Sequence, residues 1–234
     1  MRVEEERQEG FPVSVDGWFS SGWYTFRKHG GLLVRGVAIM VAFSILVAVL
    51  GYLPGGEIIG IIMQLTVGLV LTAGWLNFCL RLVREEDPVP MDILRPFGEF
   101  TRVWLPAMAL TLVVFTGSLL LIIPGFYLTV RLGMGMFTVI DKRTDVAGSM
   151  KASWRITSGH EGKLIVYYLI MIGLVGITIF PTLVGKVVLG GVASILFNFL
   201  IAPLMGVTYA SAYDSLLFLG EHRDREKNDP VSPE

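Results

Sequence analysis

The feature that most constrains this chain is a series of long apolar runs that are almost free of charged residues. A bilayer has a hydrocarbon core about 30 Å thick, and an α-helix needs roughly 20 apolar residues to cross it. Six runs approach that length, at residues 32–53, 58–83, 103–123, 126–140, 164–180 and 187–218. The sequence therefore predicts an all-α, polytopic membrane protein with six transmembrane helices arranged as three hairpins.

The composition supports this prediction and excludes other classes of protein. Hydrophobic residues make up 53% of the chain and charged residues only 17%, which is more apolar surface than a water-soluble domain of 234 residues can bury in one core. The net charge of -1 provides no global field that would attract nucleic acid, so no nucleic-acid partner is expected. Cys79 lies within an apolar run and is expected to be a small buried hydrophobe.

Proline and glycine residues mark where the apolar runs are expected to turn or bend. The segments Pro54–Glu57 and Pro124–Gly125 separate consecutive runs, which predicts two tight turns between helices. Pro203 lies inside the last run, where we expect a kink rather than a break, because neighbouring helices can satisfy the freed carbonyl.

Lysine and arginine residues fall almost entirely on one side of the predicted helices. They precede the first run, separate the second from the third and the fourth from the fifth, and follow the last, whereas Lys186 lies on the opposite side. Positive residues stay in the cytosol during insertion, so both termini are predicted to be cytosolic. Residues 1–13, and the charged tail at 221–234, which has no apolar period, are expected to be disordered.

An amphipathic helix is predicted before the first membrane run, from Ser14 to Lys28. Its apolar residues recur at three- and four-residue spacing, and Ser14 is expected to cap its first turn. The bulky aromatic face and basic end suit a helix in the cytosolic membrane interface. Packing on the protein's own cytosolic end is an equally open interpretation, and the two can coexist.

The same pattern returns about 131 positions later, which indicates an internal repeat. Ser14 aligns with Asp145, another N-cap residue, and six pairs are identical: Val15 with Val146, Gly17 with Gly148, Trp23 with Trp154, His29 with His160, Gly31 with Gly162, and Leu33 with Leu164. We infer one membrane domain at 14–220 with pseudo-repeats at about 14–84, 90–142 and 144–220. Each unit would contain an interfacial helix followed by a transmembrane hairpin.

The two amphipathic segments supply candidate membrane and partner contacts. Three tryptophans are predicted to anchor them at the headgroup level: Trp18, Trp23 and Trp154. Three basic residues are candidate contacts for anionic headgroups or an acidic partner: Lys28, Lys151 and Arg155. We expect the segments to form a shared cytosolic-side collar and the main interaction surface.

Arg131 lies about five residues into the short fourth run and must find a partner or reach the interface, because a guanidinium in hydrocarbon is costly. One interpretation is that it extends towards the nearby external interface or bonds to carbonyls of a neighbouring helix. The other is a lipid-phosphate or anion contact.

A stripe of mostly small residues recurs every four positions along the last run. It consists of Asn198, Ala202, Gly206, Ala210 and Asp214. Such a stripe lets a neighbouring helix approach closely, and a polar pathway along it is the alternative. The segment Gly133–Gly135 is also interpreted as close helix packing rather than a phosphate-binding loop.

Three segments together carry a resemblance to a known group of proteins. They are Ile122–Leu132 followed by Val139–Asp141, then Ala152–Gly159, and finally the ending Tyr209–Leu217 with Tyr213, Asp214 and Leu216. These segments resemble the signature of a broad group of bacterial six-helix membrane proteins. That group includes the membrane domain of some glycerophosphoryl diester phosphodiesterases and several families of unknown function.

The resemblance implies an architecture and a location in the bacterial cytoplasmic (inner) membrane, and it leaves the function open. Where the group carries a phosphodiesterase, catalysis resides in a separate soluble domain, which we do not expect in this chain. The chain also shows no nucleophile with a base and no cluster of metal ligands at membrane depth. His29 and His160 occupy equivalent junctions, where structural capping is favoured over a paired metal site.

We therefore expect a non-enzymatic structural or interaction component of the membrane, as a subunit of a larger complex or a homo-oligomer. The alternative is a small transporter or lipid-handling protein that uses Arg131 and the polar residues Gln64, Asn77 and Asn198. Membrane lipids are expected partners in either case, and no catalytic, cofactor-binding or metal-binding residues are predicted.

Overall fold

A computed structural model describes residues 13–183 and 197–228, and within those ranges the chain is all-helical, with no strand. Its helices follow in the order α2 (Val15–Gly51), α3 (Gly56–Met63), the π-helix η1 (Gln64–Gly68), α4 (Leu69–Val83), the 3-10 helix η2 (Pro90–Glu99), α5 (Phe100–Leu120), α6 (Ile122–Leu132), α7 (Gly135–Asp141), α8 (Val146–Thr157), α9 (Glu161–Leu183), the π-helix η3 (Phe197–Ile201) and α11 (Ala202–Asn228). The all-α class predicted from the sequence is confirmed for these residues.

Within the described residues, four helical stretches are long and apolar enough to cross a membrane: Val15–Gly51, Gly56–Val83, Pro90–Leu120 and Ile123–Asp141. Large apolar side chains remain exposed along them, including Ile45, Val49, Ile58, Ile61 and Phe115. Long rows of exposed aliphatic residues suit a hydrocarbon surrounding rather than water. The fifth predicted run corresponds to α9, whereas residues 187–196 of the sixth lie outside the described residues.

Helix α2 joins the predicted amphipathic segment and the first apolar run in one element of 37 residues. The Ser14 side chain accepts a hydrogen bond from the backbone N–H of Gly17 at 3.0 Å, which confirms the predicted N-cap. The helix bends at His29, whose φ of -117° and ψ of 20° are not helical. The change from amphipathic to apolar sequence is therefore a kink and not a break.

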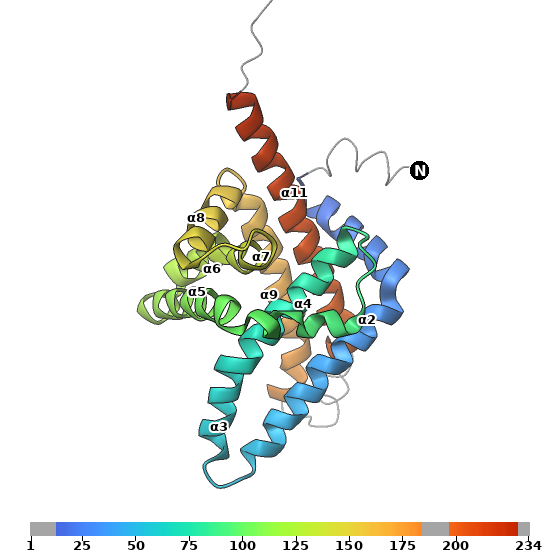
Figure 1. Ribbon diagram of the computed structural model, residues 1–234, viewed down its shortest axis with the longest axis vertical. Coiled ribbons are helices and arrows are strands. Elements are labelled where there is room, and N and C mark those ends of the chain that lie inside the picture. The colour runs from blue at the N-terminus through green and yellow to red at the C-terminus, as the bar shows by residue number, and fades with distance from the viewer. Residues whose placement is uncertain (1–12, 184–196, 229–234) are drawn as a thin grey trace, which may run out of the picture.

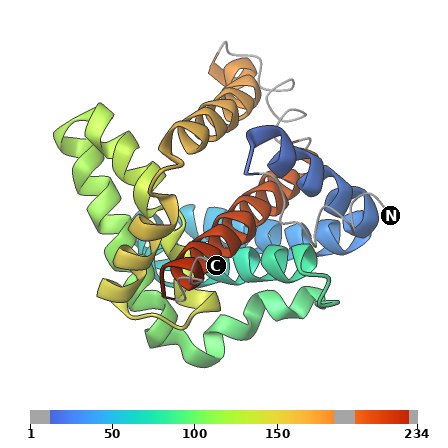
Figure 2. The same cartoon turned by 90° about the horizontal axis from the view of Figure 1, so that it is seen from above.

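Two hairpins project from the body of the protein in different directions. Helices α2 and α3 form a hairpin along the long axis of the molecule, whereas α5 and α6 lie across that direction (Figures 1 and 2). A turn separates α5 from α6, but its predicted position at Pro124–Gly125 is wrong. Helix α5 ends at Leu120 and α6 already begins at Ile122. Proline fits the first turn of a helix, where its missing N–H would have no intrahelical partner.

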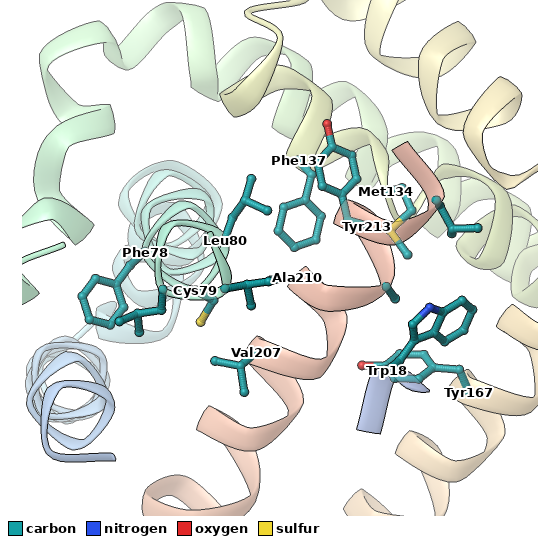
Figure 3. Close-up of a cluster of buried hydrophobic side chains, with 14 of the residues drawn as sticks. Trp18, Phe78, Cys79, Leu80, Met134, Phe137, Tyr167, Val207, Ala210 and Tyr213 are labelled. Carbon is teal, nitrogen blue, oxygen red and sulfur yellow. The ribbon is translucent and has the colours of Figure 1, made fainter. Parts of the chain in front are cut away.

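Helix α11 occupies the centre of the fold and packs against α2 and α4 on two sides (Figure 2). The cluster around it includes Trp18, Cys79, Phe137, Tyr167 and Tyr213, all of them buried (Figure 3). Cys79 is fully buried, as predicted for a small hydrophobe. The helix continues to Asn228, past the start of the predicted tail at Glu221, and residues 1–12 and 229–234 lie outside the described ranges.

The small-residue stripe lies where α11 packs against α4. A Cβ atom added at Gly206 would lie 2.8 Å from Nε1 of Trp75 and 2.9 Å from Sγ of Cys79, so the two helices touch at this glycine. Ala210 is fully buried one turn later (Figure 3). Ala202 precedes Gly206 at the start of α11, and the side chain of Asn198 lies outside the described part of the chain. Close backbone approach is the role that this geometry supports.

Replacing Gly206 by leucine should destabilise the protein, because the new side chain must displace Trp75 and Cys79. Overpacking of this kind costs about 1–3 kcal/mol in free energy of unfolding. The matched control is Gly31→Leu, since nothing lies within 4 Å of a Cβ added there. Thermal unfolding in detergent, followed by circular dichroism, measures both variants. Equal melting temperatures would contradict close packing at this position.

Candidate functional site

Arg84, which follows α4 directly, is the centre of a cluster of paired charges. Its Nε donates to Asp214 Oδ1 at 2.8 Å, and its two terminal nitrogens donate to the carboxylate of Asp141 at 2.5 and 3.1 Å. The hydroxyl of Tyr213 donates to the same carboxylate at 3.0 Å. Burial disfavours the charged guanidinium, but the hydrogen bonds to Asp141 and Asp214 outweigh it and raise the pKa of Arg84. One side chain thus joins α4, α7 and α11.

A column of aromatic residues runs from this ion-pair cluster along α11. Phe137 stacks on Tyr213 with ring centroids 4.8 Å apart and contacts Tyr209 edge-on at 5.2 Å (Figure 3). The hydroxyls of Tyr209 and Tyr168 are 2.7 Å apart, and those of Tyr167 and Thr208 are 3.1 Å apart. These hydroxyl groups are satisfied by one another, so the column places no unpaired polar atom against apolar surroundings.

The column forms one wall of an apolar pocket of about 610 Å³ between α4, α6, α9 and α11. Trp75, Met171, Ile172, Tyr168 and Gly206 are among the residues that line it. Gly133 also lies in the wall, where a Cβ atom would overlap the hydroxyls of Tyr168 and Tyr209. The segment Gly133–Gly135 therefore allows close packing, as the sequence predicts, and its glycine leaves room for the tyrosine pair.

The guanidinium of Arg131 is enclosed by protein groups at the junction of α6, α8 and α9. Its Nε donates to the Tyr127 hydroxyl at 2.9 Å, and one terminal nitrogen lies 2.9 Å from Glu161 Oε1. The other terminal nitrogen donates to Ser158 Oγ at 3.2 Å, and the group lies over the ring of Trp154 at 4.5 Å. Backbone N–H groups at Glu161 and Gly159, together with Arg131, lower the pKa of the Glu161 carboxyl.

This arrangement favours a structural role for Arg131 over an anion contact. Arg131 is 8% exposed, and each nitrogen of its guanidinium has a protein partner. The side chain also faces α8 and the first turn of α9, not the turn between α5 and α6 near which the sequence places the external interface. Its backbone carbonyl accepts a hydrogen bond from Ser153 at 2.7 Å, which fixes α6 to α8 a second time.

The other predicted basic contacts lie on the surface in different environments. Lys28 is 2.7 Å from Glu85 Oε1 and lies over the Tyr24 ring at 5.7 Å. Lys151 is exposed on α8. Arg155 lines a smaller pocket of about 340 Å³ near the ion pair between Lys142 and Glu221. The structure does not bring these three residues together into one site.

The predicted tryptophan anchors divide into one buried and two exposed residues. Trp18 is only 1% exposed, and its indole N–H donates to Ser215 Oγ at 2.8 Å, so it belongs to the core. Trp23 and Trp154 are 50% and 42% exposed. The segments that carry them lie on opposite sides of α11 (Figure 2), and the shared collar expected from the sequence stays a prediction.

The two aligned segments nevertheless have the same local geometry. Asp145 accepts a hydrogen bond from the N–H of Gly148 at 2.9 Å, as Ser14 does from Gly17 at 3.0 Å. His160 lies between α8 and α9. The equivalent residue of the first segment, His29, forms the kink in α2. The second junction is a full break, because Gly159 adopts a positive φ of 85°.

The described residues contain no group of three or more His, Cys, Asp or Glu side chains that could hold a metal ion. What the described residues offer is a set of paired charges that join helices and a pocket with a mostly apolar lining. The sequence pattern did not predict the ion-pair cluster. Arg84 and Asp141 directly follow apolar runs, and Asp214 lies in the last one. The cluster's only sequence signal is charged residues at the ends of apolar runs.

Replacing Arg84 by glutamine should lower the free energy of unfolding by about 1.5–3 kcal/mol, because Asp141 loses charge-assisted hydrogen bonds in a partly buried place. The control is Arg143→Gln, which removes an exposed pair with Glu99 and should change stability by less than about 1 kcal/mol. Chemical unfolding in detergent compares the two. A loss at Arg143 as large as that at Arg84 would exclude a special role for this cluster.

Comparison with known proteins identifies no relative of this chain. No protein-family model, no curated protein and no solved structure matches the chain.

Proposed function

We propose that the protein is a non-enzymatic, multi-pass membrane protein that holds the acyl chain of a membrane lipid between α4, α6, α9 and α11. The observation that carries this proposal is the apolar pocket of about 610 Å³. Its volume falls in the range of small-molecule binding sites, which are mostly apolar with a few placed polar groups. Lipid handling was the alternative function expected from the sequence, and the pocket now favours it.

The chemistry of the wall explains why hydrocarbon is the favoured occupant. The lining residues carry the paired hydroxyls of Tyr168 and Tyr209 and the Tyr167 hydroxyl, which lies 3.1 Å from that of Thr208. They also carry the indole N–H of Trp75 and the hydroxyl of Thr129, which already donates to the Gly125 carbonyl at 3.0 Å. Groups that are satisfied within the protein do not require a polar ligand. The pocket also lies between the apolar runs, where lipid is the surrounding medium in the proposed membrane arrangement.

The proposal includes a membrane arrangement with six membrane-embedded helices in three hairpins and both termini in the cytosol. The first part of α2 and helix α8 would lie at the cytosolic interface of a bacterial inner membrane. Support comes from the exposed Trp23 and Trp154 on these segments, their basic residues and their matching N-caps. Membership of the bacterial six-helix group, and three repeated units, belong to the same proposal.

A structural or interaction component, which the sequence favoured first, is the second candidate. The observation for it is that Trp23 is half-exposed, stacks on Phe26 with centroids 5.8 Å apart, and lies beside the exposed Tyr24. Exposed aromatic groups of this kind are enriched at interfaces with proteins and at headgroup level. The partner would be another membrane protein or a second copy of this chain.

Filling the pocket should displace the bound acyl chain without unfolding the protein. Ile172→Trp adds bulk to a lining residue that is 55% exposed, whereas Leu169→Trp makes the same change on the same helix at a residue that is also 55% exposed but does not line the pocket. Native mass spectrometry of the purified protein should show a retained phospholipid in the parent and in Leu169→Trp but not in Ile172→Trp. Retention by all three chains would refute the proposed pocket ligand.

The second candidate predicts that Trp23→Ala combined with Trp154→Ala lowers the free energy of unfolding by only about 1–2 kcal/mol, because both side chains are about half exposed and Trp154 loses its contact with the Arg131 guanidinium. The same double variant should lose any cross-linked oligomer or subunit seen with the parent in native membranes. Trp18→Ala is the contrasting variant, since removing a buried tryptophan costs about 3–5 kcal/mol. Unchanged cross-linking in the double variant would remove the interaction role from these tryptophans.

A further inference from the structure

We infer that the α5–α6 hairpin enters the membrane from the cytosolic side and turns back inside the hydrocarbon core, so that its tip does not reach water on the far side. This inference rests on the proposed orientation, in which α8 and the start of α9 lie at the cytosolic interface. It concerns one hairpin only, and the proposed lipid pocket does not depend on it.

The chemistry of the tip is the first observation. Leu119, Leu120, Leu121 and Ile123 are 76%, 75%, 67% and 83% exposed, and residues 103–130 contain no charged side chain. In water, such a tip would be a contiguous exposed apolar patch. The turn between α2 and α3 is different, because it carries Glu57 and the amphipathic Tyr52, which is 91% exposed.

Two backbone hydrogen bonds satisfy part of the tip within the protein. Leu121 is the one residue between the two helices; its N–H donates to the Gly117 carbonyl at 3.2 Å, and its own carbonyl accepts from Gly125 at 3.0 Å. Pro124 has no N–H to satisfy in the first turn of α6. A Cβ atom at Gly125 would overlap the backbone of Ser118, so the two arms are in direct contact. Segments in hydrocarbon need this kind of internal backbone satisfaction.

The length of the hairpin limits how deep it reaches. Helix α6 has 11 residues, and at 1.5 Å per residue it is about 16 Å long, roughly half of a 30 Å hydrocarbon core. Its far end is fixed, because Arg131 is bound to Glu161 and Ser158 at the α8–α9 junction. The hairpin also lies across the direction of α2 and α3 (Figures 1 and 2), which reduces its depth further.

The parts of α5 and α7 beyond this hairpin are held within the protein. The Trp104 indole N–H donates to the Leu65 carbonyl at 2.8 Å, which ties the first half of α5 to η1. Phe137 and Val139 of α7 are 0% and 1% exposed. Length and apolarity alone would allow Pro90–Leu120 and Ile123–Asp141 to cross a membrane. These contacts hold the first half of α5 and helix α7 against the rest of the protein, whereas the distal half of α5 projects from it together with α6 (Figure 2).

Three added cysteines test the inference in the full chain, with the parent as the control because Cys79 is fully buried. Tyr52→Cys reports the α2–α3 turn, Lys151→Cys reports α8 and Leu120→Cys reports the hairpin tip. A membrane-impermeant maleimide is applied to intact cells and to inverted membrane vesicles. We expect Tyr52→Cys to react in cells and Lys151→Cys in inverted vesicles. Leu120→Cys should react at least about tenfold more slowly from either side, since a thiol in hydrocarbon stays protonated.

Depth is measured independently with a bimane dye on Leu120→Cys in phospholipid vesicles. A nitroxide at the middle of the acyl chain should quench it more strongly than one on the headgroup. Leu120→Cys reacting in cells as fast as Tyr52→Cys would mean a full crossing, and reacting in inverted vesicles as fast as Lys151→Cys would mean a hairpin in water. Either result overturns the inference. Exchanged reactivity of Tyr52→Cys and Lys151→Cys would instead overturn the proposed orientation and the side of entry.

Discussion

The fold depends on keeping a few charges paired at one end of an otherwise apolar structure. Arg84 binds Asp141 and Asp214, which ties α4 to α7 and α11. Arg131 binds Glu161 and so joins α6 to α9, while Arg81 binds Asp92 and joins α4 to η2. Removing one partner from a buried pair is costly, because the other charge is left without compensation. These pairs therefore hold the helices of that end in one arrangement.

Among the residues that the structure describes, the apolar end shows no comparable polar links between helices. Large side chains at Ile45, Val49 and Ile58 on the α2–α3 hairpin are exposed. The pocket lies between the ion-paired end and the apolar end. Its wall of mutually hydrogen-bonded tyrosines is on the side of the ion pairs. Under the proposed function, a fixed wall and an apolar interior would let the pocket hold a flexible chain without rearranging its own hydrogen bonds.

Local features of this fold could be predicted from the sequence, and long-range ones could not. The caps at Ser14 and Asp145 depend on residues three positions away, so spacing was sufficient. The turn at Leu121 was missed because Pro124 suits a helix start as well as a loop. The contact of Arg84 with Asp214 spans 130 positions, and no period in the sequence encodes it. Trp18 and Trp23 share an apolar face by spacing, but α11 covers only Trp18.

The central position of α11 has a consequence for synthesis. The ribosome delivers this helix after all the other described ones, yet it provides the partners of Trp18 through Ser215, of Arg84 through Asp214 and of Tyr168 through Tyr209. Until residues 202–220 have been translated and inserted, the faces of α2 and α4 that α11 covers remain without protein contacts. Insertion of the earlier helices and closure of their common core are therefore separate events, and a chain that stops before α11 leaves these faces of α2 and α4 uncovered.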